Sequence, residues 1–351
     1  MALRRDWKAR LPEGKVAKYK VVAQGRSNAA GGFSCELEEL RGLDVELTAV
    51  TADSDTAFLE GAQDADAILV RGMPLSSTVI KRLTQCKIIA LDSVGTNHVA
   101  VAAATAKGIP VTNCPDINVQ EVAEHTAALI LAAHRRLLQM DKTVRQGLWW
   151  EGHAPLRQLP RLFGQTLGFI SFGNIPRAVV PLLKPFGLRL LAHDPFVMET
   201  VMIQYGVEPV GLQELLQRSD FICNHLPGSA GTAKLIGEEQ FRLMKSNAVF
   251  VNTGRGTTVD EAALILALDE GWIAHAALDV LEKEPPDPKN PLFTMENVTL
   301  TPHAASASAR VVEVSRRRVG REIALVLSGR WPLSCVNPSV LQSSGLRKWQ
   351  T

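Results

Sequence analysis

The stretch that decides the fold runs Leu167-Gly-Phe-Ile-Ser171-Phe-Gly173-Asn-Ile-Pro176-Arg-Ala-Val-Val180. It begins with an apolar run typical of a buried strand, continues through a glycine turn, and ends in a segment with helical spacing. Strand, turn and helix in this order allow backbone N–H groups at a helix N-terminus to approach a pyrophosphate. We therefore expect a dinucleotide-binding fold around this segment.

The turn keeps only part of the glycine fingerprint G-x-G-x-x-G, with Ser171, Gly173 and Pro176 at the three glycine positions. The middle glycine matters most, because a side chain there collides with the phosphates, and proline is tolerated in a first helical turn. Asp194 ends the strand expected at 188–193, where a carboxylate accepts hydrogen bonds from the adenosine ribose and repels a 2′-phosphate. This favours NAD over NADP; the alternative is a tight turn with Asp194 as an N-cap. The expected cofactor contacts here are Gly173, Asn174, Ile175 and Asp194.

Strand-like apolar runs alternate with helical segments along the chain, which indicates βαβ units around parallel sheets. The first block has strands at 18–24, 45–51, 67–71, 87–92 and 110–113, and the second has six, near residues 168, 188, 220, 248, 274 and 298. We predict an α/β protein with two doubly wound parallel-sheet domains and a cleft between them. A Rossmann-type NAD-binding domain over 116–305 is inserted between residues 1–115 and 306–351 of a flavodoxin-like substrate domain, with Pro115 at the crossing.

Two helices frame the predicted Rossmann-type domain. Helical spacing of apolar residues predicts one long helix from Asn118 to about Gly147, with Asn118 as N-cap and Glu121 completing a capping box. A last helix is expected over 309–327, and the tail after Pro338 is expected to be frayed.

Composition restricts the function classes. The 351 residues fit two domains, and 46% apolar with 21% charged residues excludes wholesale disorder. A net charge of +2 gives no electrostatic footprint for nucleic acid. The densest basic run, at 316–318, is expected to coat the solvent side of a helix.

The five cysteines are odd in number and scattered, so neither a disulfide framework nor a zinc site is expected, and no cluster has metal-ligand spacing. The first 13 residues lack the apolar core of a signal peptide, and no apolar run approaches the ~20 residues of a membrane span. We expect a cytoplasmic protein without a metal.

Three further apolar strands end in polar residues, where open parallel sheets bind ligands. They lead to Arg255, Glu284 and His303. Reduction of a 2-oxo acid needs a cation for the carboxylate and the carbonyl, and a proton donor for the oxygen. Arginine keeps its charge and binds bidentately, histidine titrates near working pH, and a carboxylate beside the histidine orients its ring.

At this point the chain resembles the D-isomer-specific 2-hydroxyacid dehydrogenase family over about residues 18–338. The matching stretches are Ala123-Glu-His-Thr126, Val251-Asn-Thr-Gly-Arg-Gly256, Val259-Asp-Glu261, Ala277-Leu-Asp-Val280, Glu284-Pro285 and Thr301-Pro-His303. Asn174-Ile-Pro-Arg177 and Pro302-His-Ala-Ala305 are most similar to the branch of the C-terminal-binding-protein corepressors.

The resemblance implies a role for each matching residue. His303 is the general acid/base, Glu284 its partner, and Arg255 the residue that anchors the carboxylate and polarises the carbonyl. Asp279 holds the nicotinamide carboxamide. Thr253 and Gly254 line its pocket, Pro227 and Thr232 flank the pyrophosphate and ribose, and backbone N–H groups at Val94 and Gly95 receive the substrate carboxylate. The family also implies a homodimer.

Several alternatives remain open. Arg71 is either a substrate carboxylate partner, in place of an arginine that the corepressors carry where Leu91 stands here, or an exposed structural arginine. Glu282 competes with Glu284, and His125 is expected to be structural. Glyoxylate, hydroxypyruvate and phosphoglycerate all remain substrates to consider. The rival function is an NAD(H)-sensing binding protein with little turnover.

Overall fold

The computed structural model describes residues 18–24, 32–71, 73–153 and 155–348, and the chain divides into two compact units. Unit 1 lies within residues 1–117 and 308–351, and unit 2 covers 118–307. The domain boundaries expected from the sequence, after residues 115 and 305, each lie two residues before the boundaries in the structure, after residues 117 and 307.

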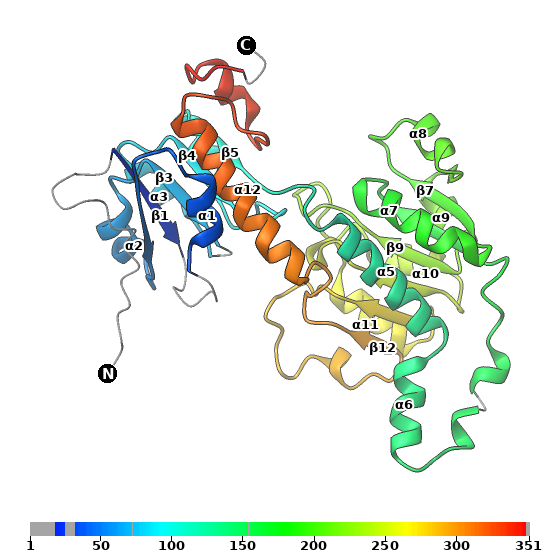
Figure 1. Cartoon of the computed structure of the whole chain (residues 1–351). Helices are drawn as coiled ribbons and strands as arrows, with labels where there is room; N and C mark the ends of the chain where they lie inside the picture. The colour runs from blue at the N-terminus through cyan, green and yellow to red at the C-terminus, as the bar shows by residue number, and fades with distance from the viewer. Residues whose placement is uncertain (1–17, 25–31, 72, 154, 349–351) are drawn as a thin grey trace. The chain divides into compact units, whose positions relative to one another are not determined.

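Unit 1 is built on a five-stranded parallel sheet in the order β2-β1-β3-β4-β5, the flavodoxin-like order. Its α12 packs along α1 (Figure 1). The strands are β1 (Tyr19–Gln24), β2 (Val45–Val50), β3 (Ala67–Val70), β4 (Ile88–Leu91) and β5 (Val111–Thr112). The helices are α1 (Ser34–Glu39), α2 (Asp55–Ala62), α3 (Ser77–Arg82), α4 (Val101–Ala106) and α12 (Ala309–Leu327).

Unit 2 is built on a seven-stranded parallel sheet in the order β12-β11-β10-β9-β6-β7-β8. The strands are β6 (Thr166–Ile170), β7 (Arg189–His193), β8 (Glu208–Pro209), β9 (Phe221–Asn224), β10 (Val249–Asn252), β11 (His275–Leu278) and β12 (Val298–Leu300). The helices are α5 (Val119–His134), α6 (Leu137–Arg145), α7 (Asn174–Leu183), α8 (Glu199–Gln204), α9 (Leu212–Arg218), α10 (Glu238–Leu243) and α11 (Glu261–Asp269). The sheet reverses between β6 and β9, and such a switch point is where Rossmann folds bind dinucleotides. The predicted Rossmann-type class is confirmed, with β8 as an added edge strand.

The strands at the centre of both sheets are buried along their whole length because helices cover both faces of a parallel sheet. All residues of β3, β4, β6, β9 and β10 are buried. A strand buried on both faces leaves only its ends for polar chemistry, so functional side chains gather in the loops that follow the strands.

The single long helix expected from Asn118 is wrong. The structure has α5 and α6, separated at Arg136, whose φ of 50° is left-handed. Asn118 makes no side-chain cap, so the expected capping box is also absent from this helix start. In the segment expected to be loop, two short 3-10 turns form, η1 (Glu151–His153) and η2 (Pro155–Gln158).

Two expectations about the C-terminal part are also wrong: the exposure of Arg316 within the basic run at 316–318, and the frayed tail. Arg316 does not coat the surface: it is 7% exposed and its Nε and Nη2 donate to the buried Glu36 carboxylate at 3.0 and 2.9 Å. The tail is not frayed up to residue 348, since η6 (Pro338–Gln342) buries Val340 and Leu341. The indole N–H of Trp331 donates to the Leu346 carbonyl at 2.9 Å.

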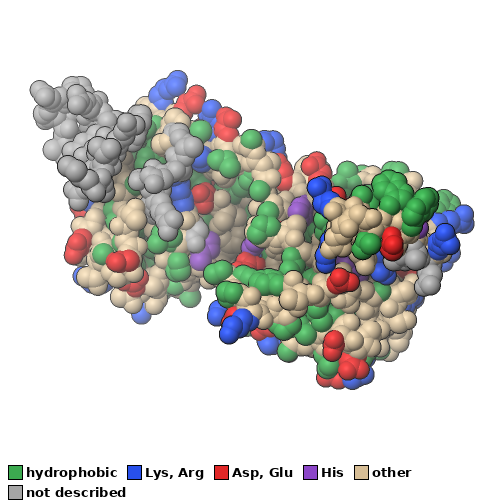
Figure 2. All heavy atoms as spheres, turned by 90° about the horizontal axis from the view of Figure 1, so that it is seen from below, with side chains coloured by type: hydrophobic (Ala, Val, Ile, Leu, Met, Phe, Trp, Pro, Cys, Tyr) green, Lys and Arg blue, Asp and Glu red, His purple; other side chains and the backbone are tan. Residues whose placement is uncertain are grey.

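The surface carries mixed charge. On the face shown in Figure 2, acidic and basic side chains are interspersed with hydrophobic ones. No helix in the described part of the chain is both long and apolar enough to span a bilayer. Within the same residues, no group of three or more His, Cys, Asp or Glu side chains is placed to hold a metal ion.

Candidate active site

The predicted catalytic residues of unit 2 follow the carboxyl ends of three adjacent parallel strands. Arg255 comes after β10, Glu284 after β11 and His303 after β12. Because β10, β11 and β12 pair in register, their carboxyl ends share one edge of the sheet. The topology therefore brings together residues that are up to 48 positions apart in sequence (303 − 255).

His303 and Glu284 form a hydrogen-bonded pair. Nδ1 of His303 lies 2.6 Å from Oε2 of Glu284. The other carboxylate oxygen, Oε1, accepts the backbone N–H of Leu281 at 3.0 Å, which fixes the carboxylate. Glu282 is directed elsewhere: its carboxylate accepts the N–H of Glu261 and pairs with Lys234. The structure thus joins His303 with Glu284 and not with its competitor.

The pair shifts both pKa values toward the charged forms. The hydrogen bond to Glu284 raises the pKa of His303, against the opposing effects of burial and of the Arg255 charge. Burial works to raise the pKa of Glu284, but the hydrogen bonds from His303 and from the Leu281 N–H outweigh it and lower that pKa. Arg255 is close enough to lower both pKa values electrostatically. Both side chains stay partly exposed, at 47% for His303 and 36% for Glu284, so a ligand can reach the pair.

The Arg255 backbone is held by buried polar side chains. Its carbonyl accepts the Thr258 hydroxyl at 2.6 Å and the Asn252 amide at 3.3 Å. The next residue, Gly256, lies so close to the following loop that a Cβ there would be 1.8 Å from the Leu281 carbonyl oxygen. Only glycine permits this approach, and it seats the Arg255 loop against the loop that leads to Glu284.

Asp279 is a buried carboxylate that organises the loop carrying His303. Its Oδ1 accepts the Thr301 hydroxyl at 2.6 Å and the Ala304 N–H at 2.8 Å, and Oδ2 accepts the Ala305 N–H at 3.0 Å. His125 is placed as a structural histidine here: its Nε2 lies 3.0 Å from the Thr301 hydroxyl. All of these hydrogen bonds of Asp279 are to other residues of the chain. The predicted contact of Asp279 with a nicotinamide carboxamide therefore stays a prediction.

The turn after β6 has the shape that the glycine fingerprint requires. Ser171 takes the first position with a left-handed φ of 75°, and its hydroxyl donates to Asp194 Oδ2 at 3.2 Å. The same oxygen accepts the Phe172 N–H at 2.8 Å, so Asp194 braces the turn as well as following β7. A Cβ added to Gly173 would meet nothing within 4 Å, which leaves open space in front of the N-terminus of α7, where Asn174 and Ile175 begin the helix. The contact of this turn with a pyrophosphate stays a prediction.

The other predicted cofactor residues lie on the loops after β9 and β10. The Thr253 hydroxyl is buried, 2.9 Å from that of Thr126, and Gly254 packs on the backbone of the β9 loop, with its hypothetical Cβ 3.0 Å from the Leu226 carbonyl. The Thr232 hydroxyl donates to the Pro227 carbonyl at 2.6 Å, so these two residues shape one exposed turn. Beside Thr253, burial lowers the pKa of His225 to about 3, which keeps this imidazole neutral.

Arg71 belongs to unit 1 and is not an exposed arginine. Its side chain is 15% exposed, pairs with the buried Glu36 through Nη2, and lies 3.7 Å from Asp92. Burial raises the pKa of Asp92 to about 6, although the Arg71 charge opposes this. Glu36 thus holds two arginines, Arg71 and Arg316, and any contact of Arg71 with substrate stays a prediction.

Val94 and Gly95 lie in the loop after β4. The carbonyl of Val94 accepts the Asn113 amide at 2.7 Å and that of Gly95 accepts the Ser93 hydroxyl at 2.8 Å. With its carbonyls held inside the unit, the loop has a fixed shape. That shape is compatible with the predicted use of its N–H groups as carboxylate donors.

The sequence-based predictions missed the residues that hold the loops of the predicted catalytic side chains. Thr301 anchors the His303 loop through Asp279, and Asn252 and Thr258 anchor Arg255. Thr301 and Asn252 both lie within the stretches that match the family, and each stands at or just after the end of a strand. That position could have indicated a role in holding the following loop.

The sequence model of the D-isomer specific 2-hydroxyacid dehydrogenase NAD binding domain matches residues 127–305. A glyoxylate reductase of Korarchaeum cryptofilum is 39% identical over 291 residues, 82% of this chain and 88% of that protein. The chain belongs to the D-isomer specific 2-hydroxyacid dehydrogenase family. It is therefore an NAD-binding oxidoreductase that interconverts 2-oxo and 2-hydroxy acids.

Other members of this family differ in extent and cofactor. A D-3-phosphoglycerate dehydrogenase of Methanocaldococcus jannaschii is 39% identical over 300 residues, covering 85% of this chain but only 56% of that protein. An NADPH-dependent glyoxylate/hydroxypyruvate reductase from Sinorhizobium meliloti, solved with NADP and malonate, has a TM-score of 0.78 and 30% identity, covering 91% of this chain and 97% of that one. Family membership thus fixes the reaction class and leaves the acid to be determined.

Proposed function

We propose that the chain is an NADH-dependent reductase of a small 2-oxo acid of the glyoxylate or hydroxypyruvate type. In this proposal His303 is the general acid/base, Glu284 its partner and Arg255 the substrate anchor. The hydrogen bond of 2.6 Å between His303 and Glu284 carries the proposal, because it prepares a protonated imidazole. Glyoxylate reductases of Korarchaeum cryptofilum and Aeropyrum pernix are each 39% identical to this chain, which supports the smaller acids as the first substrates to test.

The residues of the turn after β6 fit NAD. Gly173 leaves room for the pyrophosphate at the N-terminus of α7, and Asp194 stands where the adenosine ribose binds in such folds. The Asp194 carboxylate repels a 2′-phosphate, which supports NAD over NADP. When bound, the nicotinamide supplies the hydride that the substrate carbon accepts.

The side chains then divide the remaining work. With Nδ1 of His303 bonded to Glu284, Nε2 is the ring nitrogen left to give its proton to the carbonyl oxygen and to recover it in the reverse direction. Glu284 stabilises the imidazolium. Arg255 offers a permanent planar cation that binds the substrate carboxylate and draws electron density from the carbonyl.

The direct test is NADH oxidation with a panel of 2-oxo acids, including glyoxylate, hydroxypyruvate and 3-phosphohydroxypyruvate. His303→Ala should lower turnover by roughly 10²–10⁴-fold, the usual effect of losing positioned acid/base catalysis. His153→Ala, at an exposed histidine, is the control and should leave turnover unchanged. The proposal would be rejected if none of the tested acids is reduced, or if His303→Ala reduces them at the full rate. Tight NADH binding without any reduction would instead favour the NAD(H)-sensing protein.

We further propose that two copies of the chain associate through an apolar surface around α6. None of the α6 residues is buried within the chain. The exposed large hydrophobic residues here are Leu137, Leu138, Val144, Leu148, Trp149 and Trp150, and Trp150 is 77% exposed. Clustered aromatic and aliphatic side chains of this kind are typical of the core of a stable interface.

Size measurements test the association. The full chain should have twice its 38.1 kDa mass in solution, and Trp150→Ser should shift it toward the monomer at micromolar concentration. Phe196→Ser, at a 94% exposed aromatic outside this surface, is the matched control and should not. A monomeric wild-type chain at all concentrations would contradict the proposed dimer.

A further inference from the structure

Three buried polar side chains join the ends of β9 and β10 to the loop that carries Arg255. Asn224 and Asn252 are the last residues of these two strands and face each other in the register of the sheet. Thr258 ends η4 (Gly256–Thr258), the short 3-10 turn that follows Arg255. Each of the three residues is at most 1% exposed. We call these three residues the Asn224 cluster.

Backbone N–H groups fix the orientation of both amides in the Asn224 cluster. The N–H of Leu226 donates to Oδ1 of Asn224 at 3.2 Å. The N–H of Gly254 donates to Oδ1 of Asn252 at 3.1 Å. Because a backbone N–H can only donate, the atom facing it must be oxygen, and the NH2 group of each amide points the other way. The NH2 group of Asn224 therefore donates to the Thr258 hydroxyl oxygen at 2.7 Å and to Oδ1 of Asn252 at 3.3 Å.

The hydrogen bonds of the cluster all lead to the Arg255 carbonyl. Since the Thr258 oxygen accepts from Asn224, its own proton is left for the Arg255 carbonyl, which it reaches at 2.6 Å. The NH2 group of Asn252 and the backbone N–H of Thr258 donate to the same carbonyl at 3.3 and 3.2 Å. On the other side, Nη1 of Arg255 donates to the Gly254 carbonyl at 2.7 Å. The cluster thus holds the backbone from which the guanidinium extends.

Stability alone does not account for a polar cluster at this place. The other residues of β9, at positions 221–223, are apolar and buried. Apolar side chains could fill the same space, because replacing both partners of a buried hydrogen bond by apolar groups of the same shape is nearly neutral for stability. What only the polar side chains provide is a fixed direction of donation toward the Arg255 loop.

We propose that Asn224 is a positioning residue for Arg255. Acting through Thr258, it holds the Arg255 backbone where the guanidinium can bind the substrate carboxylate with both of its donors. A bidentate contact of this kind depends on direction as well as on distance, so a loosened loop weakens binding without removing the charge. The inference rests on the proposed function, because it takes Arg255 as the substrate anchor.

Oxamate is the probe, because it carries a carboxylate beside a carbonyl and is not reduced, so that its binding can be measured without turnover. Its Kd is determined by calorimetry on the full chain saturated with NADH. Thr258→Val removes the hydroxyl at nearly constant volume and should raise this Kd about 3–10-fold, the effect of losing one neutral hydrogen bond. Thr258→Ser keeps the hydroxyl and should bind oxamate like the unmodified chain.

A double variant separates positioning from stability. Asn224→Leu removes the donor to Thr258 and should raise the Kd for oxamate to a similar degree. In Asn224→Leu/Thr258→Val the two effects should not add, because both act on the same chain of hydrogen bonds. Each single variant leaves a buried polar group unpaired and should lower the urea midpoint, whereas the double variant should recover part of that loss. If the cluster were merely structural, the Kd would recover together with the midpoint, and this would overturn the proposal.

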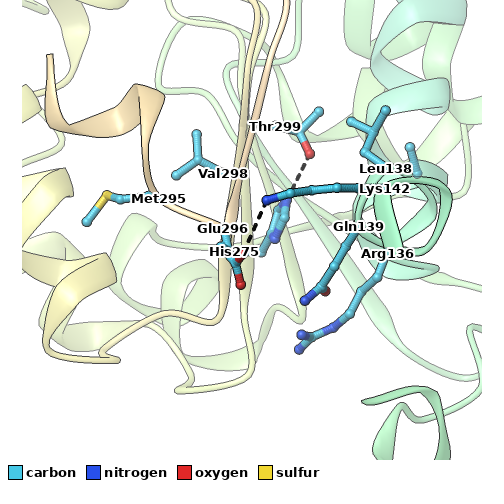
Figure 3. A pocket seen from close by; sticks show the side chains of 10 residues that line it. Arg136, Leu138, Gln139, Lys142, His275, Met295, Glu296, Val298 and Thr299 are labelled. Atoms are coloured by element: carbon cyan, nitrogen blue, oxygen red, sulfur yellow. Dashed lines mark hydrogen bonds and ion pairs between the residues drawn. The ribbon is translucent and has the colours of Figure 1, made fainter. Parts of the chain in front are cut away.

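Thr299→Val is the matched control, at another buried threonine of unit 2. The Thr299 hydroxyl lies 3.0 Å from Nε2 of His275, beside the pocket shown in Figure 3. His275 begins β11, so this contact is near the edge of the sheet opposite to Arg255. Thr299→Val should lower the urea midpoint and leave the Kd for oxamate unchanged. An equal rise of the Kd in Thr299→Val and Thr258→Val would overturn the proposal.

Arg255→Gln distinguishes a failure of this inference from a failure of the proposed function. It should raise the Kd for oxamate roughly 10–100-fold, the effect of losing charge-assisted hydrogen bonds. If Arg255→Gln binds oxamate as tightly as the unmodified chain, Arg255 is not the anchor and both proposals fall. If Arg255→Gln weakens binding but Thr258→Val does not, or if Thr258→Ser weakens it equally, only the positioning role of Asn224 is overturned.

Discussion

The backbone N–H of His303 donates to the carbonyl oxygen of Asp279 at 2.8 Å, and the Asp279 carboxylate holds the residues on either side of His303. One buried residue therefore fixes the loop on which the imidazole stands. His303 itself has a left-handed φ of 52°, a conformation that costs a non-glycine residue about 1–2 kcal/mol. The hydrogen bonds to Asp279 offset this cost and set the direction of the ring.

Asp279→Asn tests this positioning. In the asparagine, one of the two accepting oxygens becomes an NH2 donor, so at least one of the three hydrogen bonds is lost. The free energy of unfolding should therefore fall by about 1–3 kcal/mol. Misplacement of His303 should lower kcat by up to about 100-fold. An unchanged KM for NADH assigns Asp279 to positioning, while a raised KM supports the carboxamide contact. Asp269→Asn, at an exposed helix end, is the control.

The pH dependence of turnover should follow the His303–Glu284 pair. Because Glu284 raises the pKa of His303, the protonated ring that 2-oxo acid reduction needs persists to higher pH than in a free histidine. Reduction should then decline as pH rises through this raised pKa, and oxidation should increase. Glu284→Gln removes the carboxylate and should move both limbs of the kcat/KM profile to lower pH.

Glu282→Gln serves as the comparison, because its carboxylate contacts Lys234 and the Glu261 N–H and not His303. Its pH profile should match that of the unmodified chain. A profile that shifts equally in both variants would contradict the assignment of Glu284 as the partner.

Gly173→Ala separates cofactor binding from stability. The added Cβ meets nothing within 4 Å, so the free energy of unfolding should change by less than about 0.5 kcal/mol. The same Cβ occupies the space proposed for the pyrophosphate, so the Kd for NADH should rise at least tenfold, as measured by NADH fluorescence. Gly211→Ala, also an N-cap glycine with open space, should leave the Kd unchanged. Equal NADH affinity in both variants would place the pyrophosphate elsewhere.

Asp194→Ala should reduce the preference for NADH over NADPH, because the repulsion of the 2′-phosphate is lost. It should also destabilise unit 2, since the carboxylate accepts the N–H groups of Phe172 and Phe196. Ser171→Ala removes only the hydroxyl that contacts Asp194 and should keep the preference. The measurement is the ratio of kcat/KM with NADH to kcat/KM with NADPH. If Asp194→Ala leaves this ratio unchanged, Asp194 does not contact the ribose.

Local patterns predicted most of the fold correctly. The apolar strands and the turn at Gly173 were readable because each is encoded by neighbouring residues, and α12 has the predicted bounds. β8 was missed because Glu208 and Pro209 form a two-residue edge strand without a pattern of its own. The break at Arg136 carries no glycine or proline, so no local signal marked it.

Long-range pairing limited the prediction of side-chain roles. Arg316 reads as a surface residue within a basic run, and its ion pair with Glu36, 280 positions earlier, makes its burial favourable. The tendency of parallel sheets to bind ligands at their carboxyl ends predicted that Arg255, Glu284 and His303 lie at one edge of the sheet. It does not predict which of these side chains hydrogen-bond to one another. The contact of Glu284 rather than Glu282 with His303 depends on the path of the loop after β11, which spacing alone does not determine.

The pairing of Glu36 with Arg316 has a consequence for biosynthesis. Glu36 leaves the ribosome long before Arg316, and all of residues 118–307 emerge between them. Until α12 has been translated, Glu36 has Arg71 but lacks Arg316, and α1 lacks the helix it packs against, so unit 1 cannot reach its final packing before then. Unit 2 is continuous in sequence and can fold first, whereas the packing of α1 in unit 1 has to wait for α12.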